Sequence, residues 1–321
     1  MSRVRPALRL AAGAALLAFL LWRFGTGPFA DAWQVTTGGS VAAAVALTAT
    51  ATVANAWRWR VVARAFGVPL SPAGSLAAYY RSQFLNATLP GGILGDAHRG
   101  LRHGRDAGDL GAGLRAAGWD RVTGQLVQGA LLVTALLVLP TALRSYAPLA
   151  VAVAAAVVLG IVWSARRPRR TGFVGDDLRV LLRPAVLVRV AGASCVSTAA
   201  HVAVFWVALA AVDLGPATGS GPALSPASTV VIGLVVLTGA AVPLSVAGWG
   251  AREGITSAVF AMVGLGSATG LTVSVVFGVL SAVATLPGAL VLVLDAVVRR
   301  RRGPDGPEPS SSRVLEETRH G

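Results

Sequence analysis

Long apolar segments separated by short polar ones run through most of this 321-residue chain. A helix needs about 20 mostly apolar residues to cross a bilayer, and fewer where its ends reach the interface. The pattern therefore predicts an all-α fold, a polytopic transmembrane helical bundle of about eight spans. The predicted spans are Ala7–Phe24, Ser40–Ala56, Val122–Leu143, Leu149–Ala165, Val190–Val212, Thr229–Ala247, the short Gly254–Leu265 and Leu271–Val293.

Charge is scarce and gathers in a few places. Only 13% of the residues are charged, the mean hydropathy is +0.67, and the net charge of +14 comes from arginine alone. About a quarter of residues are charged in a soluble domain, so that class is excluded. The arginines cluster at both ends, between residues 58 and 121, and at 166–170. This is positive-inside topology with both termini cytoplasmic rather than a nucleic-acid surface.

The two ends of the chain receive separate predictions. The first apolar segment is interpreted as a retained helix rather than a cleaved signal peptide, because Arg23 and a long gap separate it from the small residues near Asp31. Residues 1–302 then form one integral membrane domain. Residues 303–321, rich in Pro, Ser, Glu and Arg, are expected to be a disordered cytoplasmic tail.

Two stretches broken by proline and glycine carry paired charges, from Asn86 to Arg99 and from Pro243 to Glu253. Irregular backbone with ionisable groups persists near hydrocarbon only where it is buried in protein or lines a wet cavity. The two stretches occupy corresponding positions in the two halves of the chain. We therefore interpret them as candidate re-entrant segments of an inverted repeat. Ordinary tight turns between helices remain the alternative.

The first stretch is the more informative. Asp96 and Arg99 are three residues apart, so a helix that starts after Gly95 places them on one face, with Asp96 near its positive end. The free amides of that end could instead bind an anionic headgroup. The preceding residues, with the helical spacing of Leu76, Tyr80 and Phe84, predict another helix.

Other polar residues receive simpler interpretations. Arg58, between Trp57 and Trp59, is interpreted as an interfacial anchor ahead of a phosphate clamp. Asp120-Arg121 is predicted to open the third span. Phosphate-binding-loop, zinc-protease and nucleophile-elbow motifs are absent from the sequence. We therefore expect no catalytic residue, no metal and no cofactor, and a protein that is not an enzyme.

The order of these motifs resembles the lysylphosphatidylglycerol synthase transmembrane-region family, also described as flippase-like. The resemblance rests on Asn86-x3-Pro90-x4-Gly95-Asp96-x2-Arg99, Asp120-Arg121, Asn55-x2-Arg58-Trp59-Arg60 and Pro243-x-Ser245-x2-Gly248-x-Gly250-x-Arg252-Glu253. It covers roughly Ala7 to Arg299. The sequence departs from the family at Val246 and Ala247, where Pro and Gly are usual, and at Asp96 and Asp120, where Glu is commoner.

The resemblance implies a multi-pass protein of the bacterial plasma membrane that moves a phospholipid, or a related anionic or aminoacylated lipid, between leaflets. No segment of the sequence resembles the soluble aminoacyl-transferase domain of the best-known relatives, so lipid aminoacylation is not expected from it. Its expected partners are membrane lipids and a separate lipid-modifying enzyme, not nucleic acid. The alternative is a non-catalytic scaffold for an envelope-lipid or glycan enzyme. The candidate headgroup-binding residues are Arg58, Asn86, Pro90, Gly91, Gly92, Gly95, Asp96, Arg99, Arg121, Pro243, Gly248, Gly250, Arg252 and Glu253.

Overall fold

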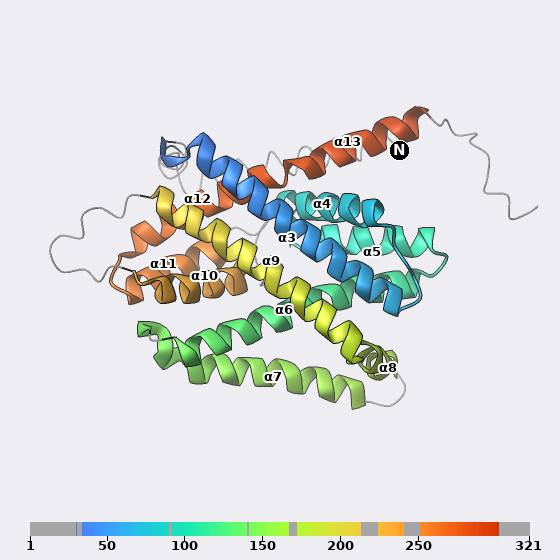
Figure 1. The fold of residues 1–321 in the computed structure, drawn as a ribbon, viewed down its shortest axis with the longest axis horizontal. Coiled ribbons are helices and arrows are strands. Elements are labelled where there is room, and N and C mark those ends of the chain that lie inside the picture. Colours follow the sequence, from blue (N-terminus) through green and yellow to red (C-terminus); the bar gives the residue numbers. More distant parts are fainter. Residues whose placement is uncertain are drawn as a thin grey trace, which may run out of the picture.

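The computed structural model describes residues 30, 34–89, 92–139, 141–166, 172–212, 224–240 and 251–301. Within these ranges the chain consists of helices joined by short turns and holds no strand, so the predicted all-α fold is confirmed. The helices (Figure 1) are α3 (Gly38–Ala65), α4 (Pro72–Thr88), α5 (Leu94–Asp106), α6 (Leu110–Val138), the 3-10 helix η1 (Ala142–Tyr146), α7 (Ala147–Arg166), α8 (Gly172–Leu181), α9 (Pro184–Ala211), α10 (Pro226–Ala240), α11 (Ala251–Met262), α12 (Ser267–Ala284) and α13 (Leu286–Arg301).

Five segments of the described chain are long and apolar enough to cross a membrane: 38–65, 110–138, 142–164, 184–211 and 267–297. They coincide with five of the eight predicted spans. The sixth and seventh predicted spans correspond to α10 and α11, which have only 15 and 12 residues. The predicted first span, 7–24, and the predicted tail, 303–321, lie outside the described residues.

One predicted boundary is wrong, and one predicted span contains a break between two helices. The third span begins at Leu110 rather than Val122, because the Asp109 side chain caps the helix by accepting a hydrogen bond from the Ala112 amide at 2.8 Å. The last span is divided between α12 and α13, with Pro287 in the first turn of α13. Proline has no amide hydrogen to continue the preceding helix, so the chain breaks there.

The helices assemble as two similar sets around α3 and α9, which pack against each other and run in opposite directions (Figure 1). In the first set α3 contacts α4 and α6, and α5 lies along α6. In the second, α9 contacts α10 and α12, and α11 lies along α12. Each set is a long helix, two short helices and another long helix, which is the arrangement expected of the predicted inverted repeat.

Small residues bring the helices close together where polar groups meet. Gly100 and Gly104 of α5 face Gly113 of α6 so closely that a Cβ on any of them would crowd the partner backbone. Gly288 of α13 likewise lies against the backbone of Tyr80. Close approach through glycine is typical of helix contacts in membranes, where apolar burial alone contributes little.

Candidate functional site

Helices α4 and α5 form a hairpin whose break lies at residues 89–93. Pro72 at the start of α4 and the Ser71 side chain, which accepts from the Gly74 amide, fix the beginning of that helix. Gly92 has a φ of +57°, a backbone region that favours glycine. The first turn of α5 has no cap from its own N-cap residue, Ile93. Instead, the Asn86 side chain accepts from the Gly95 amide at 2.8 Å.

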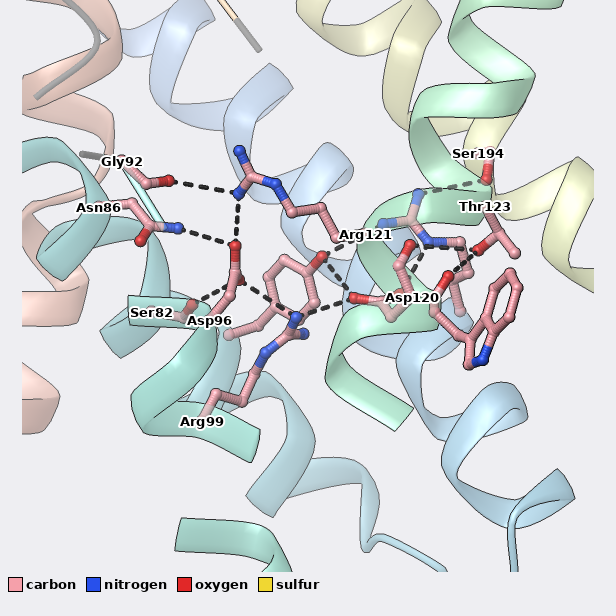
Figure 2. A network of polar contacts seen from close by, with 12 residues as sticks. Ser82, Asn86, Gly92, Asp96, Arg99, Asp120, Arg121, Thr123 and Ser194 are labelled. Carbon is pink, nitrogen blue, oxygen red and sulfur yellow. Dashed lines mark hydrogen bonds and ion pairs between the residues drawn. The ribbon is translucent and has the colours of Figure 1, made fainter. Parts of the chain in front are cut away.

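The carboxylate of Asp96, in that first turn, gathers four side chains (Figure 2). Its Oδ1 accepts from Ser82 at 2.9 Å and from Arg99 at 3.2 Å, and its Oδ2 accepts from Asn86 at 3.2 Å and Arg121 at 2.6 Å. Burial alone would raise the pKa of this carboxyl. Arg99 and Arg121, with the Ser82 hydrogen bond, more than offset burial and hold the pKa below its usual value.

A second carboxylate, Asp120, lies completely buried in the middle of α6. Its Oδ1 accepts from Arg58 Nε at 2.8 Å, and its Oδ2 accepts from Arg99 Nη2 at 2.9 Å and from the Tyr79 hydroxyl at 3.0 Å. Arg58 also donates to Ser194 of α9 at 3.2 Å. Burial, with the nearby Asp120 charge, raises the pKa of the Tyr79 phenol to about 12, so this hydroxyl stays protonated as a donor.

Arg99 links the two carboxylates and is the most enclosed of the arginines. Its guanidinium lies 4.4 Å from the centre of the Trp59 ring and 4.2 Å from that of Tyr79, an arrangement that favours a cation. Only 1% of its surface is exposed, yet its Nε and Nη1 have no hydrogen-bond partner. Buried donors without partners are rare in native structures, and here the two aromatic rings are the groups that stabilise this cation.

We call Arg58, Asp96, Arg99, Asp120 and Arg121 the hairpin cluster. Its three arginines and two aspartates leave one positive charge unbalanced. Arg121, with 31% of its side chain exposed, and Asp96, with 17%, are its accessible edge, whereas Arg99 and Asp120 are closed off. The cluster therefore has the charge and the donors to hold one monovalent anion, with entry past Arg121.

Arg252 and Glu253 form a separate cluster at the start of α11. Arg252 donates to Glu253 Oε1 through Nε at 3.0 Å and Nη2 at 2.6 Å, and to Ser274 of α12 at 3.2 Å. Both side chains are buried. Helices α11 and α5 lie on opposite sides of the bundle in Figure 1, so the two halves present two polar clusters.

The structure brings together five of the predicted site residues, Arg58, Asn86, Asp96, Arg99 and Arg121, with Gly92 and Gly95 shaping the break. Arg252 and Glu253 lie in the second cluster. The predicted residues Pro90, Gly91, Pro243, Gly248 and Gly250 fall outside the described residues.

Two interpretations from the sequence are wrong. Arg58 and Trp59 are not interfacial anchors, because both are buried, and Arg58 pairs with Asp120. Trp57 remains half-exposed beside Arg60, as an anchor should be. Asp120 and Arg121 do not open a helix but lie well inside α6.

Tyr79, Ser82 and Ser194 were not predicted to belong to the site. Tyr79 and Ser82 lie on α4 and Ser194 on α9, and serine or tyrosine at such positions gives no signal in the sequence. Asp120 did give a signal in the sequence, because it is a carboxylate beside an apolar segment. No three His, Cys, Asp or Glu side chains converge as a metal site within the described ranges.

Comparison with known proteins identifies the family of the chain. The sequence profile of the family described as "Lysylphosphatidylglycerol synthase TM region" matches residues 7–288, and the chain belongs to that family. No curated protein and no solved structure matches the chain. The match and the apolar helices together make it a multi-pass integral membrane protein of a lipid-related family.

Proposed function

We propose that this member of the lysylphosphatidylglycerol synthase transmembrane-region family moves an anionic phospholipid between the two leaflets of a bacterial plasma membrane. The observation that carries the proposal is the unbalanced positive charge of the hairpin cluster inside an apolar bundle. A charge that its partners do not balance is costly beside apolar helices and is kept where it serves a ligand or a pathway. A phosphodiester carries one negative charge and has oxygens that match arginine donors.

Arg121 is the first contact in this proposal. Its Nη1 now bonds to Asp96 and, at 3.3 Å, to the carbonyl of Gly92. An arriving phosphodiester competes with Asp96 for Arg121, and the amide of Asn86 lies beside the same carboxylate. Acyl chains stay in the hydrocarbon while the headgroup passes. The protein acts by binding and releasing lipid and makes no covalent bond, so it is not an enzyme in this proposal.

The basic segments set the proposed orientation. Both termini and the hairpin of α4 and α5 are cytoplasmic by the positive-inside rule. The headgroup is thus received from the inner leaflet. A separate lipid-modifying enzyme is the proposed supplier where the substrate is aminoacylated.

Reconstitution tests the proposal. Vesicles containing phosphatidylglycerol labelled on one acyl chain are assayed for leaflet exchange with a membrane-impermeant quencher. We expect exchange with the wild-type protein and a loss of about tenfold or more with Arg121→Ala, because a hydrogen bond to a charged group contributes about 1.5–3 kcal/mol. Arg121→Lys should retain part of the rate, since it keeps the charge without the planar donor fork.

The matched control is Arg179→Ala, which removes an exposed arginine paired with Asp176 on α8. Its exchange rate should equal the wild-type rate. Equal rates in Arg121→Ala and wild type would refute the headgroup site. No exchange above protein-free vesicles, with a stoichiometric enzyme co-purifying from native membranes, would favour the scaffold function instead.

A further inference from the structure

An apolar groove of about 810 Å³ lies on the side of the bundle between α6 and α9. Helix α10, which is visible between these two helices in Figure 1, contributes Val230 and Leu234 to the lining of the groove. The walls are Leu131 to Leu139 of the α6 end and Cys195 to Val207 of α9. The lining is almost entirely apolar.

The length of this groove along α9 is close to the hydrocarbon thickness of one leaflet. From Cys195 to Val207 a helix rises roughly 18 Å at about 1.5 Å per residue, a little more than half of the roughly 30 Å hydrocarbon core. Helices α6 and α9 are both long and apolar enough to span the membrane. The groove therefore opens sideways into hydrocarbon rather than into water.

One end of the groove adjoins the hairpin cluster. Ser194, buried, receives the hydrogen bond from Arg58, and the next residue, Cys195, is exposed and lines the groove. From Cys195 the groove continues towards the C-terminal end of α9, which is the end away from the basic segments. By the proposed orientation α9 begins at the cytoplasmic side, so the groove lies mainly in the outer half of the bilayer. A lipid with its headgroup at the hairpin cluster points a tail into that half.

We infer that the groove between α6 and α9 binds one acyl chain of the glycerophospholipid whose phosphate the hairpin cluster receives. The inference rests on the proposed function and adds to it the path of the tail. Methylenes packed against Leu131, Val202 and Trp206 gain dispersion contacts along the length of the chain.

Photocrosslinking tests the inference without measuring transport. The purified full-length protein is reconstituted with phosphatidylglycerol that carries a photoactivatable diazirine on an acyl chain, irradiated, digested and mapped by mass spectrometry. We expect adducts concentrated on the groove peptides of α6 and α9. Unlabelled diacyl phosphatidylglycerol should displace the label.

Two variants fill the groove: Ala199→Trp and Ala203→Trp, at lining positions of α9. Each should reduce groove adducts by about tenfold or more, the loss expected when an indole displaces two or three methylenes. The control is Ala155→Trp on the exposed face of α7, which should leave the adducts unchanged. If one groove variant fails to fold, as judged by gel filtration, the other supplies the comparison.

Adducts spread evenly over all exposed helices, or unaffected by both tryptophans, would overturn the inference. So would displacement by a polyprenyl phosphate but not by diacyl lipid. Groove adducts without leaflet exchange would leave the groove standing and refute the proposed function. Leaflet exchange with scattered adducts would support the proposed function and refute the binding of an acyl chain in the groove.

Discussion

Asp120 is the residue on which the hairpin cluster depends most. It is fully buried and bonds to Arg58, Arg99 and Tyr79 at once, so its removal leaves the buried Arg58 guanidinium without its carboxylate and Arg99 with Asp96 alone. Breaking a buried pair in this way costs about 3–5 kcal/mol. We expect Asp120→Ala to lower the free energy of unfolding in detergent by about that amount, measured by denaturant titration.

The control for this prediction is Asp176→Ala, which breaks the exposed pair with Arg179 on α8. Exposed pairs contribute about 1 kcal/mol or less, so this variant should unfold close to wild type. Equal stability of the two variants would contradict the assignment of Asp120 as the centre of the cluster.

Asp96 gives the cluster a dependence on pH. Because Arg99 and Arg121 hold the pKa of its carboxyl below the usual value despite burial, the folded protein favours the ionised form. The stabilisation is complete above the usual carboxyl pKa of about 4 and is lost as the pH falls through the lowered folded value. We expect the difference in melting temperature between wild type and Asp96→Asn to be constant from about pH 5 to 8 and to narrow below about pH 4. A difference that narrows towards alkaline pH would contradict this sign.

At the residue scale the sequence predicted what depends on short spacing. Asp96 and Arg99 pair as expected because three residues apart on a helix is a fixed geometry. Arg58 was misassigned because tryptophan and arginine at a helix end have the same composition in an anchor and in a buried cluster. Its partners Asp120 and Ser194 lie 62 and 136 residues away, a proximity that only the fold creates.

The hairpin of α4 and α5 is the element that positions the cluster, and its inner face is polar. The buried residues of α4 include Ser75, Tyr79, Arg81 and Ser82, whereas Tyr80 and Phe84 of the apolar stripe are only half-buried and lie against Gly288 of α13. The spacing correctly predicted a helix here. Which face is buried did not follow from it, because in a membrane the apolar face can lie outward and the polar face inward.

Gly95 is the closest contact within this hairpin. A Cβ there would overlap the carbonyl of Ser82 and the side chain of Asn86, so Gly95→Ala should push α5 away from α4. We expect a loss of about 1–3 kcal/mol in the free energy of unfolding and slower lipid exchange. Gly129→Ala in α6, where a Cβ meets nothing within 4 Å, should be neutral or slightly stabilising. Hydrogen exchange of the α5 amides separates the two: faster exchange is expected in Gly95→Ala alone, and equal exchange would refute the close contact.

At the scale of the whole molecule, the two helix sets and the basic segments define one orientation. Ala107, between α5 and α6, and Ser145, in η1, are both exposed and lie at opposite ends of α6. We expect a membrane-impermeant maleimide to label Ser145→Cys in intact cells and to label Ala107→Cys only after lysis. Both variants are made in a Cys195→Ser background, since Cys195 is the only cysteine.

The Cys195→Ser protein alone should remain unlabelled. The opposite pattern would invert the orientation, and labelling of both positions in intact cells would contradict the crossing of α6.

The overall arrangement of the helices could be predicted from hydropathy and from the paired broken segments. The depth of α10 and α11 could not, because short apolar helices acquire their positions from the helices around them rather than from their own length.

The ion pairs of the last helix have a consequence for how the protein is made. Asp295 of α13 accepts at 2.6 Å from both Arg81 of α4 and Arg102 of α5, and thereby joins the two arms of a hairpin encoded some 200 residues earlier. Asp295 follows Arg102 by 193 residues and Arg81 by 214, so a nascent chain must be extended by that length after the hairpin before these ion pairs can form.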